Sequence, residues 1–154
     1  MQSPADDRRW LSLAIALSER CPPSTTAFSV GAVIVDEHGK EISRGFSRET
    51  PHVHAEEAAL EKLDADDDRL RAATVYSSLE PCTRRRSHDR TCSELIIAAG
   101  LKRVVIAWRE PPTFVHDAHG VEALRAQGIE VVEYTDLAQA AAAVNAKLLT
   151  RTGA

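Results

Sequence analysis

The amino-acid sequence predicts an α/β protein with a five-stranded mixed sheet, on two observations. The apolar run 30–35, the turn 37–40 and the extended stretch 41–46 are typical of an antiparallel hairpin. In the second half of the chain, extended and helical patterns alternate, which favours right-handed crossovers between parallel strands. A chain of 154 residues without repeats or a linker is typical of one domain, and we expect residues 1–154 to form it.

The first element is expected to be a helix. Ser3 is suited to be its N-cap and Pro4 to be its first residue, and the acidic residues at 6 and 7 match the positive end of the helix dipole. The apolar residues that follow keep helical spacing as far as Cys21, before the proline pair 22–23 ends the helix. This pattern predicts that Cys21 lies in the core.

Periodicity also defines the elements after the hairpin. Apolar residues keep helical spacing from Ala55 to Leu63, and the acidic stretch 64–68 is expected to be a solvated connector. Glycines at 100 and 128 are typical of helix C-termini. The later elements are expected as strands at 74–79, 103–108 and 129–134, helices at 91–99 and 121–127, and a final alanine-rich helix from Thr135 or Asp136 to about Leu149.

Composition and charge narrow the functional classes. A net charge of −4 gives no basic field to attract nucleic acid, and three Phe, two Tyr and two Trp are few for the stacking surfaces of single-strand binders. The acidic start is unlike a secretory signal, and no apolar run approaches a membrane span. We therefore expect a cytoplasmic protein that acts on a small molecule, with no nucleic-acid or membrane partner. Three cysteines without an export signal favour metal binding or catalysis over disulfides.

His54, Cys82 and Cys92 are the candidate metal ligands. One histidine and two thiolates suit zinc, and three protein ligands leave the fourth tetrahedral position open for water, as in catalytic sites. The residues lie where the second and third helices are expected to start, and helix N-termini favour thiolates. For any one of them alone, a small buried cysteine or a helix-capping histidine would be the ordinary interpretation. Together they favour a zinc site.

Glu56 is the candidate catalytic residue. It lies two residues past His54 on the first helical turn, so it can reach a water on the zinc without binding the metal. Zinc lowers the pKa of such a water toward ~7. The carboxylate would take its proton, pass one to a ring nitrogen and protonate the departing ammonia. The pattern H-x-E followed by P-C-x-x-C is typical of zinc nucleobase deaminases, although nine residues separate Cys82 from Cys92.

Four stretches of the chain resemble the cytidine-deaminase superfamily, and within it the diaminopyrimidine deaminase family of riboflavin biosynthesis, especially its fungal form. The stretches are Ala27–Val33, Gly45–Glu49 leading to His54–Glu56, Leu79–Thr83 and Glu110–Val115. The nine-residue interval before Cys92 is also similar to the fungal form. The resemblance implies a three-layer α/β/α cytidine-deaminase-like fold, with zinc on His54, Cys82 and Cys92 and with Glu56 as the proton shuttle.

The resemblance also implies a substrate and partners. The substrate would be a diaminopyrimidinone that carries a ribitylamino or ribosylamino 5′-phosphate. A cytosine, cytidine or deoxycytidylate deaminase is the alternative, because these enzymes share the zinc constellation. A non-catalytic zinc-binding module is a more remote alternative, since such a site would not need Glu56. We further expect a homodimer or larger homo-oligomer, and a separate reductase, because 154 residues leave no room for a reductase domain.

Substrate contacts are expected on both sides of the zinc ligands. Charged or polar residues precede His54, and an arginine cluster lies between the two cysteines. Arginine can clamp a phosphate with paired hydrogen bonds, but a solvated surface run is the ordinary alternative. His88 could compete as a ligand, and Trp108 has no assigned role. The candidate substrate-binding residues are Arg48, Glu49, His52, Arg84, Arg85 and Arg86.

Overall fold

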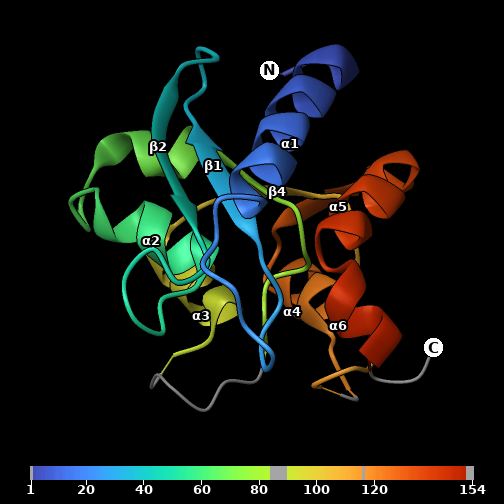
Figure 1. The fold of residues 1–154 in the computed structure, drawn as a ribbon. Helices are drawn as coiled ribbons and strands as arrows, with labels where there is room; N and C mark the ends of the chain where they lie inside the picture. Colours follow the sequence, from blue (N-terminus) through green and yellow to red (C-terminus); the bar gives the residue numbers. More distant parts are fainter. Residues whose placement is uncertain (1, 84–89, 116, 152–154) are drawn as a thin grey trace.

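Five strands form one sheet in the computed structural model, which describes residues 2–83, 90–115 and 117–151 (Figure 1). In sheet order the strands are β2 Glu41–Phe46, β1 Gly31–Val35, β3 Thr74–Ser77, β4 Arg103–Ile106 and β5 Glu130–Glu133. β1 is antiparallel to both β2 and β3, whereas β3, β4 and β5 are parallel to one another. The predicted mixed sheet with an antiparallel hairpin is therefore confirmed.

Helices cover both faces of the sheet. On one face α1 packs beside α5, and the other face carries α2, α3 and α4 (Figure 1). This is the three-layer α/β/α arrangement that the resemblance implied. The α-helices are α1 Pro4–Ser18, α2 Ala55–Glu61, α3 Cys92–Ala99, α4 Gly120–Ala126, α5 Ala138–Val144 and α6 Ala146–Arg151, and short 3-10 helices lie at Asp68–Ala72 and Thr135–Leu137.

Two apolar cores form because neighbouring residues of a strand point to opposite faces. In β3, Val75 belongs to the core under α2, α3 and α4, whereas Tyr76 belongs to the core under α1 and α5. Both side chains are almost completely buried. The alternation fixes the register of the strands, because a slip by one residue would expose both cores.

A buried carboxylate connects α1 to the sheet. Asp7 is 1% exposed and accepts hydrogen bonds from the hydroxyls of Tyr76 at 2.7 Å and Tyr134 at 2.8 Å. The Arg103 guanidinium donates two more, at 2.9 and 2.7 Å. Burial by itself raises the pKa of Asp7, but the hydrogen bonds from Arg103 and the tyrosines hold it below its ordinary value. Asp7 therefore stays charged at neutral pH and is paired with Arg103.

The first helix begins as predicted but ends earlier. The Ser3 hydroxyl accepts a hydrogen bond from the Asp6 N–H at 3.1 Å, which confirms Ser3 as the N-cap. The helix ends at Ser18, whereas its apolar pattern predicted helix as far as Cys21. The prediction that Cys21 is a core residue is wrong: it is half-buried in a turn, and its thiol donates to the Val30 carbonyl at 3.5 Å. Apolar spacing also predicted a longer second helix, as far as Leu63, whereas α2 ends at Glu61.

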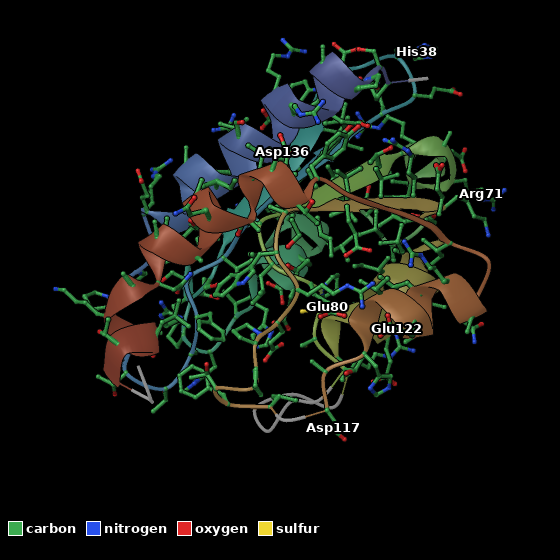
Figure 2. The ribbon with its side chains drawn as sticks, turned by 90° about the vertical axis from the view of Figure 1, so that its right-hand side faces the viewer. His38, Arg71, Glu80, Asp117, Glu122 and Asp136 are labelled. Atoms are coloured by element: carbon green, nitrogen blue, oxygen red, sulfur yellow. The ribbon has the colours of Figure 1, made fainter. Side chains whose placement is uncertain are left out.

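The predicted single C-terminal helix is also wrong, because the chain breaks at Asn145 between α5 and α6. Asn145 is 4% exposed, and its side-chain amide bonds to the backbone of Ser29 rather than to solvent. The start of this C-terminal segment is attached to α1, where Arg8 Nε donates to the Asp136 carboxylate at 3.1 Å (Figure 2).

Within the part of the chain that the structure describes, no helix combines the length and apolar character needed to span a membrane.

Candidate active site

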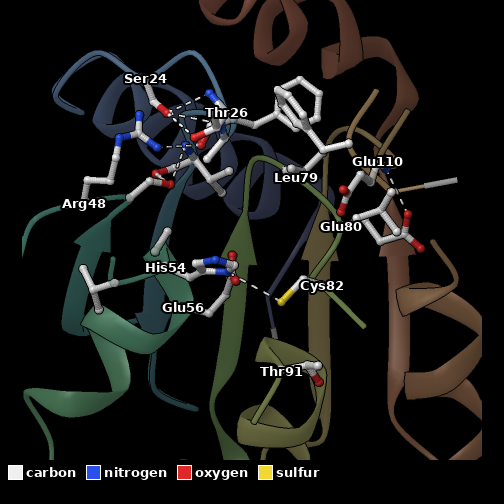
Figure 3. A pocket seen from close by; sticks show the side chains of 18 of the residues that line it. Ser24, Thr26, Arg48, His54, Glu56, Leu79, Glu80, Cys82, Thr91 and Glu110 are labelled. Atoms are coloured by element: carbon white, nitrogen blue, oxygen red, sulfur yellow. Dashed lines mark hydrogen bonds between the residues drawn. The ribbon is translucent and has the colours of Figure 1, made fainter. Parts of the chain in front are cut away.

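One cavity of about 1230 Å³ lies at the carboxyl ends of β3 and β4 (Figure 3). In an open α/β sheet this edge is the usual place for a ligand, because the loops that follow parallel strands meet there. Four segments supply the walls. They are the segment 24–30 before β1, residues 47–56 between β2 and the start of α2, residues 79–83 after β3, and residues 110–115 and 117 after β4.

The structure brings the three predicted metal ligands together at this cavity. His54 directly precedes α2 and Cys92 is the first residue of α3, so two helix starts hold two of the ligands. The Nδ1 atom of His54 lies 3.5 Å from Cys82 Sγ and 3.3 Å from Cys92 Sγ. The three donor atoms all lie within 4.8 Å of one another.

These distances fit a tetrahedral zinc ion. Zn–N and Zn–S bonds of about 2.1 and 2.3 Å at tetrahedral angles put a histidine nitrogen about 3.6 Å from a cysteine sulfur. Cys92 is buried, whereas His54 and Cys82 are partly exposed and line the cavity. One side of this cluster of three ligands therefore faces the space where a substrate would lie. The residues can therefore hold a metal and leave it accessible.

Cys82 is the cysteine that ionises more readily. Its Sγ accepts a hydrogen bond from the Cys92 backbone N–H at 3.2 Å. A hydrogen bond from the Cys92 thiol, followed by the effects of His54, lowers the pKa of Cys82. The same hydrogen bond to Cys82, together with burial, raises the pKa of Cys92. A metal cation at this position would favour the thiolate form of both.

Glu56 lies on the first turn of α2, beside His54 and Cys82 (Figure 3). It is 4% exposed and still lines the cavity, and burial raises its pKa. The Ser77 hydroxyl at the end of β3 lies 2.7 Å from Glu56 Oε1 and 2.7 Å from the Leu79 carbonyl oxygen. Since this hydroxyl has a single proton, it can donate to only one of these oxygens at a time. When it donates to Glu56, Ser77 holds Oε1 in place, and the Cys92 side chain makes a further hydrogen bond to the same carboxylate.

The other predicted site residues divide into three groups. Arg48 and His52 line the cavity, and both have left-handed backbone conformations with φ of 60° and 66°. Glu49 is not among the lining residues, because its carboxylate pairs with Lys62 at 2.7 Å. The predicted contacts of these residues with substrate stay predictions. The remaining candidates, Arg84, Arg85, Arg86 and His88, lie outside the described residues.

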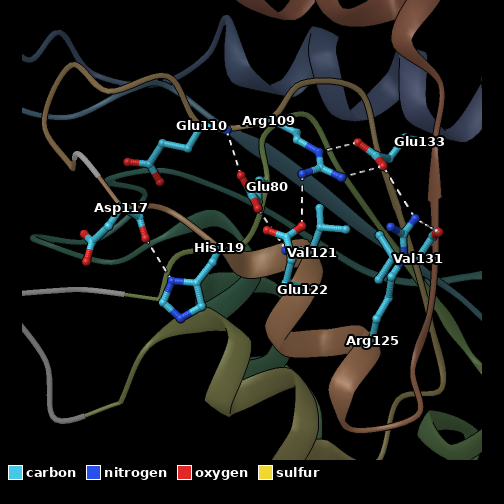
Figure 4. Close-up of polar contacts among 10 residues, drawn as sticks. All are labelled: Glu80, Arg109, Glu110, Asp117, His119, Val121, Glu122, Arg125, Val131 and Glu133. Carbon is cyan, nitrogen blue, oxygen red and sulfur yellow. Dashed lines mark hydrogen bonds and ion pairs between the residues drawn. The ribbon is translucent and has the colours of Figure 1, made fainter.

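Sequence reasoning did not single out Glu80, although it named the Leu79–Thr83 stretch that contains it. Glu80 is 4% exposed, and its two carboxylate oxygens accept the backbone N–H groups of Glu110 at 2.9 Å and Val121 at 2.8 Å (Figure 4). The side chain therefore fastens both ends of the loop between β4 and α4, which forms a wall of the cavity. Nothing in the sequence shows which N–H groups a buried carboxylate will meet.

An exposed ion-pair network fastens the same loop from outside. Arg109 donates to both carboxylate oxygens of Glu133, at 2.7 and 3.0 Å, and to Glu122 at 2.9 Å (Figure 4). Next to it, the Glu110 side chain is partly buried in the cavity wall. Burial, and then the charges of Cys82 and Glu80, raise the pKa of Glu110 to about 7. Glu110 is a second functional candidate that sequence reasoning did not single out.

Comparison with solved structures supports the fold. The diaminohydroxyphosphoribosylaminopyrimidine deaminase/5-amino-6-(5-phosphoribosylamino)uracil reductase of Thermotoga maritima superposes with a TM-score of 0.80 at 31% identity. The match covers 96% of this chain and 41% of that one. The three-layer fold and the His54, Cys82, Cys92 and Glu56 cluster define a hydrolytic deaminase with the cytidine-deaminase-like fold.

The family model described as the cytidine and deoxycytidylate deaminase zinc-binding region matches residues 4–108, and the chain belongs to this family. Two relatives share the name diaminohydroxyphosphoribosylamino-pyrimidine deaminase. The Schizosaccharomyces pombe protein is 40% identical over 86% of this chain, which spans only 33% of that relative. The Buchnera aphidicola protein is 32% identical, and the match covers 81% of this chain and 82% of that protein. Membership of this family and the names of these relatives favour a hydrolytic deaminase over a non-catalytic module.

Proposed function

We propose that this chain, acting as a single zinc-dependent deaminase domain, deaminates a diaminopyrimidinone ribosylamino or ribitylamino 5′-phosphate in riboflavin biosynthesis. The observation that carries the proposal is the placement of Glu56 beside His54, Cys82 and Cys92 at the floor of one cavity. The names of the fungal and bacterial relatives support the choice of substrate. We further propose that the enzyme is cytoplasmic and homo-oligomeric, and that a separate reductase acts next.

In this mechanism the protein residues position and move protons. His54, Cys82 and Cys92 would hold zinc, which when bound supplies the Lewis acidity that makes water nucleophilic near neutral pH. Glu56 takes a proton from the attacking water and gives one to the ring nitrogen beside the attacked carbon. It then takes the remaining proton from the new hydroxyl and passes it to the amino group, so that the carbon–nitrogen bond breaks and ammonia leaves as the carbon–oxygen bond becomes a carbonyl. Ser77 keeps the Glu56 carboxylate oriented during both transfers.

The test is ammonia release from four compounds: the ribosylamino and ribitylamino diaminopyrimidinone phosphates, deoxycytidylate and cytosine. Each is incubated with the parent enzyme and with Glu56→Gln, which should reduce kcat at least about a hundredfold because general acid–base catalysis contributes that much. Glu61→Gln is the matched control, since Glu61 is exposed on the same helix.

The result also separates two substrates. Turnover of a diaminopyrimidinone, lost in Glu56→Gln and kept in Glu61→Gln, is the expected outcome. Turnover of deoxycytidylate or cytosine alone would favour the second candidate, which the description of the matching family suggests. That outcome would keep the mechanism and reject the proposed substrate.

A further inference from the structure

One wall of the cavity is a segment before β1 that is joined to the end of β2 only near Val30, whose carbonyl accepts the Ser47 N–H at 3.0 Å. Residues 24–30 run from the turn after α1 to the start of β1, and they lie outside the strands. Arg48 fastens the segment from one side, since its guanidinium donates to the carbonyls of Pro22 and Phe28 and to the Ser29 hydroxyl, at 2.8 to 3.1 Å. Side chains from other elements therefore determine the shape of this wall.

Asn145 fastens the same segment from the other side. Its Oδ1 accepts the Ser29 N–H at 2.7 Å, and its Nδ2 donates to the Ser29 carbonyl at 3.1 Å and to the Ala141 carbonyl at 3.3 Å. The amide thus pairs with both backbone groups of one residue, as a neighbouring strand would. Asn145 lies at the break between α5 and α6, and the break is what allows its side chain to point at Ser29 rather than along a helix.

An apolar contact accompanies this pair of hydrogen bonds. Leu148 on α6 is 7% exposed and belongs to the same buried cluster as Phe28. Phe28 in turn packs edge-on against Trp108 and Phe114, with ring centroids 5.3 and 5.0 Å away. Phe28 and Phe114 both line the cavity, so the C-terminal helices support an aromatic surface of the pocket. Trp108 thereby gains a role, which the sequence alone did not suggest.

We propose that Asn145 is a positioning residue of the substrate site, which sets the wall 24–30 and thereby the affinity for substrate. The inference rests on the proposed function for the substrate that it uses. Asn145 lies beyond residues 4–108, the part that the family model matches, so it adds the C-terminal helices to the site. Since Glu56 and the metal ligands are held by other elements, losing Asn145 should weaken binding more than it slows the chemical step.

The kinetic test compares Asn145→Ala with the parent enzyme on the diaminopyrimidinone phosphate that the parent deaminates. We expect KM to rise about tenfold with kcat within about twofold, because two hydrogen bonds to the partly buried backbone of Ser29 are lost. Gln139→Ala changes an exposed residue of α5 and should keep the parental values. Val131→Ala truncates a buried β5 side chain, 7% exposed, and controls for a general loss of stability.

Hydrogen–deuterium exchange tests the same contact without any substrate. In Asn145→Ala, amides of residues 24–30 should exchange faster than in the parent and in Val131→Ala, while those of β3 stay protected. Suppose residues 24–30 exchange faster in Asn145→Ala, but the parent enzyme turns over neither diaminopyrimidinone. The proposed function would then be rejected, whereas the conclusion that Asn145 positions residues 24–30 would stand.

Two outcomes would overturn the positioning role. One is a parental KM in Asn145→Ala, and the other is a change in exchange and kinetics that Val131→Ala reproduces. If Asn145→Ala does not fold, Asn145→Ser replaces it in both experiments. Serine is a good N-cap for α6, so this variant keeps the helix start while its shorter side chain cannot make the paired contact with Ser29.

Discussion

Replacing Glu80 by glutamine should loosen the cavity loop, and the size of the effect can be worked out from its contacts. The carboxylate accepts two backbone N–H groups, at 2.9 and 2.8 Å, and is 4% exposed. Glutamine keeps one acceptor oxygen but turns an NH₂ group toward the other N–H. One charge-assisted hydrogen bond is lost and a buried donor is left unsatisfied, which costs about 2 kcal/mol.

The assay is urea unfolding followed by circular dichroism, with a thermal melt beside it. A loss of about 2 kcal/mol corresponds to a fall in Tm of roughly 4–8 °C for a chain of this size. Glu122→Gln is the matched control, since Glu122 is exposed on α4 and pairs with Arg109 at 2.9 Å, and its loss should stay below about 1 kcal/mol. A Glu80→Gln protein as stable as Glu122→Gln would refute the reasoning that this carboxylate fastens the loop.

Two further predictions concern the scaffold. Asp7→Asn should lower the free energy of unfolding by about 3 kcal/mol at neutral pH, since it leaves the Arg103 charge without its buried partner. The pKa of Asp7 is lowered in the folded protein, so urea unfolding at a series of pH values should show the whole difference above pH 3.8. The difference should narrow as the pH falls through the pKa of Asp7 in the folded protein. Gly45→Ala should lower the free energy of unfolding by about 1–3 kcal/mol and also lower kcat. A Cβ on Gly45 would lie 2.6 Å from the Ala59 backbone nitrogen and would push α2, with Glu56, away from the sheet. A variant with parental stability and turnover would contradict this prediction.

The sequence predicts the reacting residues because their chemistry restricts them. A histidine and two cysteines near helix starts have few roles together other than metal binding. A glutamate two residues after the histidine lies on the same helical turn and therefore close to the same site. The strands were predictable for a similar reason, since runs such as 30–35 must be buried on both faces. In both cases the pattern lies within a few residues along the chain, where sequence reasoning is reliable.

The clearest misjudged feature depends on a partner that is distant in sequence. Asn145 breaks an alanine-rich helix because its amide pairs with Ser29, 116 residues earlier. Helix propensity favours a continuous helix there, and tertiary hydrogen bonds override it. Cys21 keeps the apolar spacing of α1, but the chain has already turned toward β1. Arg48 has the sequence context of an exposed loop charge, yet its guanidinium makes two hydrogen bonds to Pro22 and two to residues 28 and 29 of the wall.

This division explains why the chemistry of the enzyme is easier to infer than its substrate. The proton carrier and the metal ligands lie on helix starts that rest directly on the sheet, where packing fixes them. The walls at 24–30, 110–115 and 117 are loops whose positions depend on Asn145, Arg48 and Glu80, which are neither metal ligands nor the proton carrier. Substitutions at these three residues can reshape the pocket while the metal ligands and Glu56 stay in place, so that one fold can act on substrates with different rings. Substrate specificity should therefore depend on Asn145, Arg48 and Glu80 rather than on the metal ligands.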